Sequence, residues 1–420
     1  MNERTNENSD LTNAMAILDV ARRIGLSYDL DELLDKIVSE TASVLNCERA
    51  TLFLYDPGQK ELYSKIAHGT GQIRVSIDHG IVGACARSGQ LINIPDAYAD
   101  PRFHQEVDLK TGYRTRNILS CPLVGHKKQL VGVLQAINRR WGVFSSTDEW
   151  LLETLSSQAA VAIQRTYLLS VHEEKQRMEH ELNLAREIQL GLLPKESPKI
   201  RGYQIAGWNR PADQTGGDCY DFLITDENDP GILLADASGH GIAPALVVAQ
   251  LRAILRALSG TSMPLPQIMS RVNNILCRDL PGDRFVTAFF GMLSSSKHEL
   301  IYCSAGQAPL LHVKPAKKVV HTLMANACPL GIIEGMSFPV ADPIKFDPGD
   351  IFLLVTDGFF EWTNSAGEQF GIERLEKLAL TLANLPAEQF IDQLRNRVEQ
   401  FGESTPQKDD LTAVVIKRIK

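Results

Sequence analysis

Aspartates at the ends of apolar segments are the residues of this chain whose types and positions could do chemistry. The clearest case is the run Ile232–Ala235, which is typical of a buried strand and leads directly into Asp236 and the glycine-rich turn Ser238–Gly241. A carboxylate at the end of a strand, beside backbone that a ligand can approach closely, is a candidate to contact a ligand in a cleft. The pattern Asp-x-Ser-Gly is also an ordinary turn and helix start, so this segment alone leaves both interpretations open.

Further aspartates in the C-terminal half stand in the same relation to apolar strands. They occur in the segments Gly216–Asp221, Ala235–Gly239, Val355–Gly358 and Lys408–Thr412. A sheet could gather these carboxylates at one end, where they would repel one another unless protonated or neutralised by cations. Oxygen ligands without a CxxC pair or a metal-type histidine spacing favour Mg²⁺ or Mn²⁺ over zinc. Two such ions about 4 Å apart can lower the pKa of a bridging water and stabilise an in-line displacement at phosphorus.

The sequence lacks the signature motifs of several other classes of protein. The motifs GxSxG, GxxxxGK[ST] and HExxH do not occur, which weakens esterase, NTPase and metalloprotease interpretations. The net charge of -8 argues against a general binder of nucleic acid or of anionic membranes. The seven cysteines form no CxxC pair, and Cys121 and Cys303 lie in apolar runs, as small core residues do in a reducing cytoplasm. No signal peptide or long apolar span is visible, so we expect a cytoplasmic protein without a membrane partner.

The elements that must position these residues suggest two or three domains in the 420-residue chain. Residues 12–165 combine flanking helices with short strands, which predicts an α+β sensor domain. Residues 166–194 are predicted to form a helical linker. In residues 195–420 the strands mostly follow one another and the helices come in separate pairs, which predicts two packed sheets flanked by helices.

The stretch between Val143 and Leu190 contains neither glycine nor proline and predicts one long helix. Ser146–Glu149 resembles a capping box at its start, with Ser146 reaching forward and Glu149 reaching back. Heptad positions in its second half are Leu168, Val171, Lys175, Met178, Leu182, Ala185, Gln189 and Leu192, of which six of eight are apolar. This favours a coiled coil between two copies of the chain, and hence a homodimer. The alternative is a solitary amphipathic helix lying against its own domain.

Six segments of the C-terminal half carry a resemblance to a known family. In chain order they are GGDCYDF, LLADASGHGIAPAL, FVTAFFGML, SAGQAPLL, LLVTDGFFEW and DDLTAVVI. They resemble the motifs of metal-dependent PPM-type serine/threonine phosphatases, most of all the bacterial SpoIIE/RsbU-like branch, and the preceding LAREIQLGLLP is similar to that branch's linker. The resemblance covers about Arg186 to Lys420. It implies an α/β/β/α sandwich, two Mn²⁺ or Mg²⁺ ions, and hydrolysis of phosphoserine or phosphothreonine on a protein.

The same resemblance implies roles for individual residues. Asp236 is expected to bridge both metal ions, and the backbone carbonyl of Ala237 to complete one coordination shell. Further metal ligands are expected from Asp218, Asp357 and Asp409. Catalysis is therefore assigned to Asp236 and Asp218 together with the ions they hold.

Other positions in these motifs stay open. Asp221 and Asp410 either bind metal, hold a turn or orient a ligand, and His240 is interpreted as structural because metal already acidifies water. Cys219 stands where the family usually has a bulky residue, and Gln307 where histidine is common. Neither departure touches a proposed ligand. In the family, the helix that follows the metal turn is thought to couple dimer geometry to metal binding.

The N-terminal region resembles a GAF domain of the cyclic-nucleotide-binding type over roughly Leu11 to Arg165. The resemblance rests on the segments 96–103 and 108–117 and on Asn138-Arg139, Phe144 and Asp148-Glu149. In that signature Arg139 can pair with Asp148, which locks the fold. The same Asp148-Glu149 pair also serves the helix start, and both interpretations can hold together.

The resemblance implies cAMP or cGMP as the GAF ligand, and Gln135 leaves the choice between them open. The residues expected to face the nucleotide are Asp108, Thr111 and Thr115 through their side chains, and Ile81 and Val82 through backbone N–H groups. The alternative is a GAF fold used only for dimerisation or for another small molecule.

These expectations combine into a dimeric signalling phosphatase of the bacterial cytoplasm. The GAF domain senses a ligand, the coiled coil transmits the change, and the metal domain hydrolyses a phosphoprotein. The branch's substrate is often an anti-sigma-factor antagonist of the STAS type, so the resemblance implies such a partner. The alternative from another class is a non-catalytic, ligand-gated scaffold that binds a phosphoprotein, which the intact set of aspartates disfavours.

Overall fold

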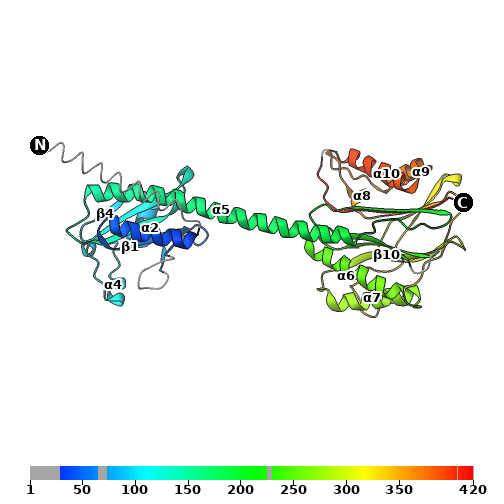
Figure 1. The fold of residues 1–420 in the computed structure, drawn as a ribbon, viewed down its shortest axis with the longest axis horizontal. Coiled ribbons are helices and arrows are strands. Elements are labelled where there is room, and N and C mark those ends of the chain that lie inside the picture. Colours follow the sequence, from blue (N-terminus) through cyan, green and yellow to red (C-terminus); the bar gives the residue numbers. More distant parts are fainter. Residues whose placement is uncertain (1–28, 65–72, 225–228, 404, 420) are drawn as a thin grey trace. The chain divides into compact units, whose positions relative to one another are not determined.

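The structure is a computed structural model that describes residues 29–64, 73–224, 229–403 and 405–419 (Figure 1). The chain divides into two compact units, Met1–Arg177 and Met178–Lys420, and the division falls inside one long helix. The sequence pattern predicts a helical stretch over Leu11–Leu45 and a strand over Glu61–Ala67, and the first part of the former and residues 65–67 of the latter lie outside the described residues.

The first unit is built on an antiparallel sheet of six strands in the order β3-β2-β1-β6-β5-β4. Its strands are β1 Cys47–Asp56, β2 Glu61–Ser64, β3 Arg74–Ser76, β4 Ile92–Ile94, β5 Ile118–Val124 and β6 Leu130–Arg139. Its helices are α2 Leu30–Val44, α3 Gly80–Ser88, α4 Gln105–Thr111, the start of α5 Ser146–Leu192, and the short 3-10 turns η1 Ala97–Ala99 and η2 His126–Lys128. Helix α2 and the start of α5 cover one face of the sheet and α3 covers the other. The predicted α+β arrangement is confirmed.

Helix α5 begins with a capping box that lies one residue earlier than predicted. Asp148 accepts hydrogen bonds from the backbone N–H (2.7 Å) and the hydroxyl (2.8 Å) of Ser145, and Ser145 accepts from the N–H of Asp148 (3.3 Å). Ser146 and Glu149 therefore do not form the box. The predicted pairing of Arg139 with Asp148 is confirmed, since Arg139 Nε lies 2.8 Å from a carboxylate oxygen of Asp148. Asp148 thus ties the end of β6 to the start of α5.

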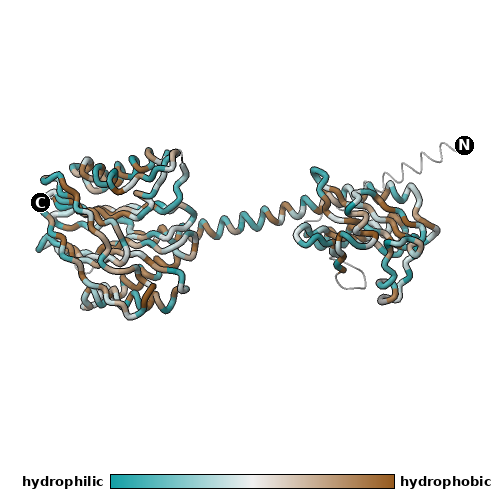
Figure 2. Tube along the Cα trace, turned by 180° about the vertical axis from the view of Figure 1, so that it is seen from behind, coloured by the Kyte–Doolittle hydropathy of each residue, from teal (hydrophilic) through white to brown (hydrophobic). Residues whose placement is uncertain are grey.

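The middle of α5 carries apolar side chains that neither unit covers. Residues 167–181 are all exposed, among them Leu168, Val171 and Met178 at the predicted heptad positions. Val161, seven residues before Leu168, is also exposed although neighbouring residues are buried in the first unit. Figure 2 shows this part of the helix as mainly hydrophilic with interspersed hydrophobic residues. A helix with an uncovered apolar seam fits the predicted coiled coil, which stays a prediction.

The second unit contains two five-stranded antiparallel sheets. Sheet C has the order β14-β11-β10-β9-β8 and sheet B the order β13-β12-β15-β16-β7. The strands of sheet C are β8 Asp218–Ile224, β9 Pro230–Ala237, β10 Val286–Ser294, β11 Glu299–Ala305 and β14 Ile344–Lys345. Those of sheet B are β7 Tyr203–Arg210, β12 Leu310–Lys314, β13 Val319–Leu323, β15 Ile351–Val355 and β16 Leu411–Arg418. The helices are α6 Ile242–Ser259, α7 Leu265–Asp279, α8 Gly358–Glu361, α9 Ile372–Leu382 and α10 Ala387–Phe401, with the 3-10 turn η3 Pro315–Lys317.

Three apolar cores hold this unit together as a four-layer sandwich (Figure 1). Helices α6 and α7 pack on sheet C, α9 and α10 pack on sheet B, and the two sheets face one another through residues such as Phe289 and Phe352. Inward-facing side chains alternate along each strand, because successive residues of a strand point to opposite faces. The predicted α/β/β/α sandwich is confirmed.

The cysteines behave as the sequence predicts. All seven are free, and burial raises the pKa of Cys121 to about 11 and that of Cys303 to about 12. Neither thiol is activated at neutral pH.

One expectation about membrane segments needs a correction. Among the described residues, α6 is long and apolar enough to cross a membrane by length and composition, although the sequence was expected to hold no such span. Its apolar residues Val247, Val248, Leu251 and Leu255 are buried against sheet C.

Candidate metal centre

Strands β8 and β9 place two of the predicted ligands directly opposite one another. In their antiparallel register Asp218 pairs with Asp236, so the Cβ atoms of the two residues are expected about 5 Å apart on one face. Because Gly217 has no side chain, its backbone can pack closely against this pair of strands. A Cβ atom there would lie only 2.7 Å from the carbonyl oxygen of Ala237, whose own N–H donates to the carbonyl of Gly217 at 3.0 Å.

Sheet B brings its carboxylates to the same end of the sandwich. Asp357 follows Thr356 at the end of β15, and Asp409 and Asp410 precede β16, which pairs with β15. The link between the sheets is made by Thr356 and Thr412, whose hydroxyls both donate to one carboxylate oxygen of Asp218, at 2.7 Å and 2.6 Å. Asp218 is therefore held from across the sandwich by two neighbouring strands.

The electrostatics show that these carboxylates act on one another. Burial, followed by the charges of Asp357, Asp409 and Asp410, raises the pKa of Asp236 to about 7. Burial, then Asp409 and Glu361, raises the pKa of Asp357 to about 6. Burial, then Asp236 and Asp410, raises the pKa of Asp218 well above its ordinary value. An accumulation of negative charge that is partly buried requires either protons or cations.

The donor set fits divalent cations that prefer oxygen. The acidic groups near Asp236 are carboxylates, and no cysteine thiolate is available there because burial raises the pKa of Cys219 further above its ordinary value. Within the described residues, no three His, Cys, Asp or Glu side chains are already gathered as a ready-made metal site. The carboxylates are thus within electrostatic reach of one another, and closing a coordination sphere requires side-chain rearrangement. The ligand roles of Asp218, Asp236, Ala237, Asp357 and Asp409 remain predictions.

The two aspartates left open by the motifs have structural partners. Asp221 is fully buried and lies against Arg252 (2.9 Å) and Arg256 (2.6 Å), which attach α6 to β8. Asp410 accepts hydrogen bonds from the backbone N–H groups of Ala212 (2.7 Å) and Asp218 (3.2 Å). Both residues therefore hold the frame of the site.

Two further motif residues can now be placed. His240 is exposed in the turn after Asp236, and its interpretation as structural stays a prediction. Gln307 is buried and bridges the sheets: it accepts from the hydroxyl of Thr287 (3.0 Å) and donates to the carbonyl of Val355 (2.9 Å). Since Thr287 pairs with Asp236, Gln307 supports the strand that carries the central aspartate.

Sequence reasoning missed one contact at this site, made by the end of α5. The side-chain amide of Gln189 donates to the carbonyl of Gly216 (2.6 Å), and its oxygen accepts from the N–H of Gly216 (3.1 Å). Gly216 lies two residues before Asp218, so α5 holds the candidate metal loop directly. The signal available in the sequence was a polar glutamine at an otherwise apolar heptad position.

The predicted nucleotide-facing residues of the first unit are partly brought together. Asp108 and Thr115 are buried and bond to each other, through the Thr115 N–H at 2.6 Å and the Thr115 hydroxyl at 2.8 Å. Ile81 and Val82 lie in the first turn of α3, whose N–H groups have no partner within the helix. The side chain of Thr111 lies outside the described part of the structure. All of these roles remain predictions.

Comparison with known proteins also distinguishes an N-terminal and a C-terminal domain. Residues 226–419 match the family model described as Stage II sporulation protein E (SpoIIE), and residues 29–163 match that of the GAF domain. Over 278 residues the chain is 25% identical to the phosphoserine phosphatase RsbU of Bacillus subtilis, covering 66% of this chain and 80% of RsbU.

Two further relatives are similar to parts of the chain. Over 198 residues it is 31% identical to a cGMP-specific 3',5'-cyclic phosphodiesterase of Drosophila ananassae, covering 43% of this chain. The chain spans only 17% of the length of that enzyme. The solved SiaA-PP2C domain of Pseudomonas aeruginosa is 21% identical with a TM-score of 0.52, over 59% of this chain and 99% of that one, and shares the fold.

Proposed function

We propose that this chain is a metal-dependent protein phosphatase of the SpoIIE/PP2C type, controlled by its N-terminal GAF domain. The observation that carries this proposal is that Thr356 and Thr412, next to the acidic ends of sheet B, hold the carboxylate of Asp218 from sheet C. Asp218 and Asp236 come from sheet C, Asp357 and Asp409 from sheet B, and burial and mutual repulsion raise the pKa values of Asp218, Asp236 and Asp357.

Divalent ions at this place would supply a bound water of lowered pKa and would neutralise the phosphate. Asp218, Asp236, Asp357, Asp409 and the carbonyl of Ala237 are the groups proposed to hold them. The remaining residues fix these groups in place. Thr356 and Thr412 orient Asp218, and Gln307 supports the strand of Asp236 through Thr287.

The experiment that tests the activity is hydrolysis of p-nitrophenyl phosphate and of a phosphoserine peptide by the full chain. We expect hydrolysis with Mn²⁺ or Mg²⁺, its loss after treatment with EDTA, and its recovery when the metal is restored. A chain that binds the phosphoserine peptide but does not hydrolyse it at saturating Mn²⁺ is a scaffold, and the proposal is then wrong.

The proposed substrate is a serine- or threonine-phosphorylated protein of bacterial signalling, namely an anti-sigma-factor antagonist of the STAS type. The similarity to a phosphoserine phosphatase, RsbU, supports this class of substrate. Release of phosphate from a phosphorylated STAS-type protein tests it, with a phosphotyrosine peptide as the control that should stay intact.

The proposed ligand of the GAF domain is cAMP or cGMP. Asp108 and Thr115 carry the side chains proposed to engage a purine edge or a cyclic phosphate, and in this structure the N–H and hydroxyl of Thr115 donate to Asp108. The similarity to a cyclic phosphodiesterase points the same way. Titration calorimetry with each nucleotide is expected to show binding of one of them, and no heat from either at millimolar concentration would remove the assignment.

Helix α5 is proposed to transmit the signal within a homodimer. The uncovered seam with Leu168, Val171 and Met178 supports pairing with a second chain, and Gln189 connects the same helix to Gly216 beside the metal loop. A small twist of α5 would therefore move the loop that carries Asp218. Sedimentation equilibrium should give the mass of two chains. A single-chain mass at micromolar concentration would contradict the pairing of two chains through this seam.

A further inference from the structure

Arg284, which lies just before β10, differs from other arginines near the candidate metal centre. Arg252 and Arg256 both pair with the buried Asp221. For Arg284, within the described residues, no carboxylate forms an ion pair and no group accepts a hydrogen bond from the side chain, although the residue is half-buried. A guanidinium is planar and carries five N–H donors. A half-buried one without an acceptor in the protein is suited to an anion that comes from outside.

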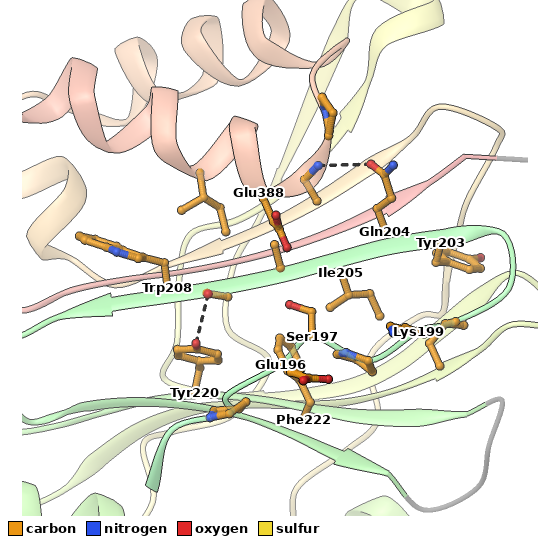
Figure 3. A pocket seen from close by; sticks show the side chains of 18 of the residues that line it. Glu196, Ser197, Lys199, Tyr203, Gln204, Ile205, Trp208, Tyr220, Phe222 and Glu388 are labelled. Carbon is orange, nitrogen blue, oxygen red and sulfur yellow. Dashed lines mark hydrogen bonds between the residues drawn. The ribbon is translucent and has the colours of Figure 1, made fainter. Parts of the chain in front are cut away.

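A groove of about 1180 Å³ along β7 gives no comparable indication of a ligand (Figure 3). Polar groups that line it already have partners in the protein. The hydroxyl of Tyr220 donates to the carbonyl of Gly207 (3.1 Å), and the N–H of Ala387 donates to the side chain of Gln204 (3.2 Å). Acidic and basic side chains both line this groove, so its charge selects no class of ligand.

The register of sheet C places Arg284 beside the turn that follows the central aspartate. Asp236 of β9 pairs with Thr287 of β10. Two hydrogen bonds continue this pairing beyond the strands. The N–H of Ser238 donates to the carbonyl of Phe285 (3.0 Å), and the N–H of Phe285 donates to the hydroxyl of Ser238 (3.1 Å). Arg284, the residue before Phe285, therefore lies next to the glycine-rich turn.

The guanidinium of Arg284 lies against the backbone of this turn. A Cβ atom at Gly239 would lie 3.8 Å from Nη1 of Arg284. Gly239 is exposed and has a φ of +97°, so the guanidinium lies beside bare backbone that a ligand can approach. Arg284 precedes Thr287 by three residues, which places it about 10 Å along the strand from the level of Asp236. One arginine side chain and one phosphate group together span that distance.

The charges around the candidate metal centre favour a further cation at its rim. The four carboxylates proposed to hold two divalent ions carry as much negative charge as the ions carry positive charge. A phosphorylated side chain adds a charge of about −1.5 to −2 at pH 7. Arg284 is not used to neutralise the carboxylates, since the charges that shift the pKa of Asp236 most are those of other aspartates. Its guanidinium can therefore compensate the phosphate, and its planar fork matches two phosphate oxygens.

We propose that Arg284 binds the phosphate of the phosphorylated serine or threonine and holds it beside the carboxylate cluster. The guanidinium donates two N–H groups to two oxygens of the phosphate, an arrangement that a lysine cannot reproduce. This inference rests on the proposed phosphatase function, since it names the residue that recognises the phosphate of that substrate. Phosphoserine and phosphothreonine carry the same phosphate group, so Arg284 selects for phosphorylation rather than for the sequence around it.

The test is a calorimetric titration of the full chain with phenylphosphonate in the presence of Mg²⁺. Phenylphosphonate resembles a phosphate monoester, but its carbon–phosphorus bond is not hydrolysed. Arg284→Gln is expected to weaken its binding about tenfold or more, because the variant loses a bidentate hydrogen bond between charged groups. Arg284→Lys should retain part of the affinity, since it keeps the charge and loses the fork. Lys297→Gln removes an exposed cation at the other end of β10 and should bind as the unmodified chain does.

A second titration, with Mg²⁺ alone, separates the binding of the anion from damage to the turn after Asp236. Arg284→Gln should bind Mg²⁺ as the unmodified chain does, because Arg284 is not one of the proposed metal ligands. Equal affinity of Arg284→Gln and the unmodified chain for phenylphosphonate overturns the proposal. A loss of phenylphosphonate binding that is matched by an equal loss of Mg²⁺ binding also overturns it, and so does an unmodified chain that does not bind phenylphosphonate.

Hydrolysis of the phosphoserine peptide is measured separately, so the two proposals can fail independently. A chain that hydrolyses the peptide, and binds phenylphosphonate equally well with and without Arg284, keeps the phosphatase function and loses this inference. A chain that binds phenylphosphonate through Arg284 and does not hydrolyse the peptide keeps the phosphate-binding residue and loses the proposed activity.

Discussion

Asp236→Asn is expected to abolish metal-dependent hydrolysis while leaving the second unit folded. The negative charges of Asp357, Asp409 and Asp410 all act on the carboxylate of Asp236. A bound cation is therefore expected to compensate the charge of Asp236 most. Asparagine keeps the shape of the side chain and removes the charge. Since metal ions supply several kcal/mol of transition-state stabilisation, losing their anchor should lower kcat about 10³-fold.

Folding should not suffer from this substitution. Burial, and then repulsion by neighbouring carboxylates, disfavour the ionised form of Asp236 and raise its pKa to about 7, and the neutral amide removes both costs. The measurements are kcat against Mn²⁺ concentration, Mn²⁺ binding by calorimetry, and thermal unfolding without metal. Asp342→Asn, at an exposed aspartate of the same unit, is the matched control and should keep full activity. Hydrolysis by Asp236→Asn at the rate of the unmodified chain would remove the assigned mechanism.

The elements of the second unit were largely predictable because their apolar patterns are regular. The apolar patterns predict a strand over Ile351–Val355 and a helix over Ala387–Phe401, and both occur with these bounds. The pairing of strands was not predictable from periodicity. Strand β8 begins at Asp218, whereas the apolar pattern predicts a strand over Tyr220–Thr225, because Asp218 pairs with Asp236 in the next strand. Strand β7 pairs with β16, some two hundred residues later, through contacts that no local pattern encodes.

The candidate site was likewise predictable where it depends on local sequence, and not where it depends on contacts between distant residues. Motif resemblance and strand ends indicated the aspartates, but the clamp formed by Thr356 and Thr412 on Asp218 depends on the distance between two sheets. The capping box was misplaced by one residue because Ser145 and Ser146 are adjacent and both Asp148 and Glu149 follow. The local sequence does not indicate which of the two serines forms the capping box with the acidic residue three positions later.

Asp221→Asn is expected to destabilise the second unit by about 3 kcal/mol, since removing one partner of a buried ion pair leaves the other charge uncompensated. Asp221 has no exposed side-chain surface, and Arg252 beside it is 13% exposed. The contact of Arg252 Nε with Asp221 is an ion pair without hydrogen-bond geometry, so its compensation is electrostatic and an amide cannot replace it. Arg256 is 49% exposed, and water can solvate it after the change, which places the expected loss at the lower end of the range for buried pairs.

Arg256→Gln provides the matched control, because it removes the more exposed cation and leaves the pair of Asp221 with Arg252. We expect it to lower the free energy of unfolding by about 1 kcal/mol. Urea denaturation followed by circular dichroism gives both values. A loss below 1 kcal/mol for Asp221→Asn would show that the pair contributes little to stability. The ion pair fastens α6 to β8, and α6 starts directly after the turn Ser238–Gly241, which follows Asp236 and Ala237 at the end of β9. A loosened α6 should therefore also weaken Mn²⁺ binding, which separates this residue from aspartates that only stabilise the fold.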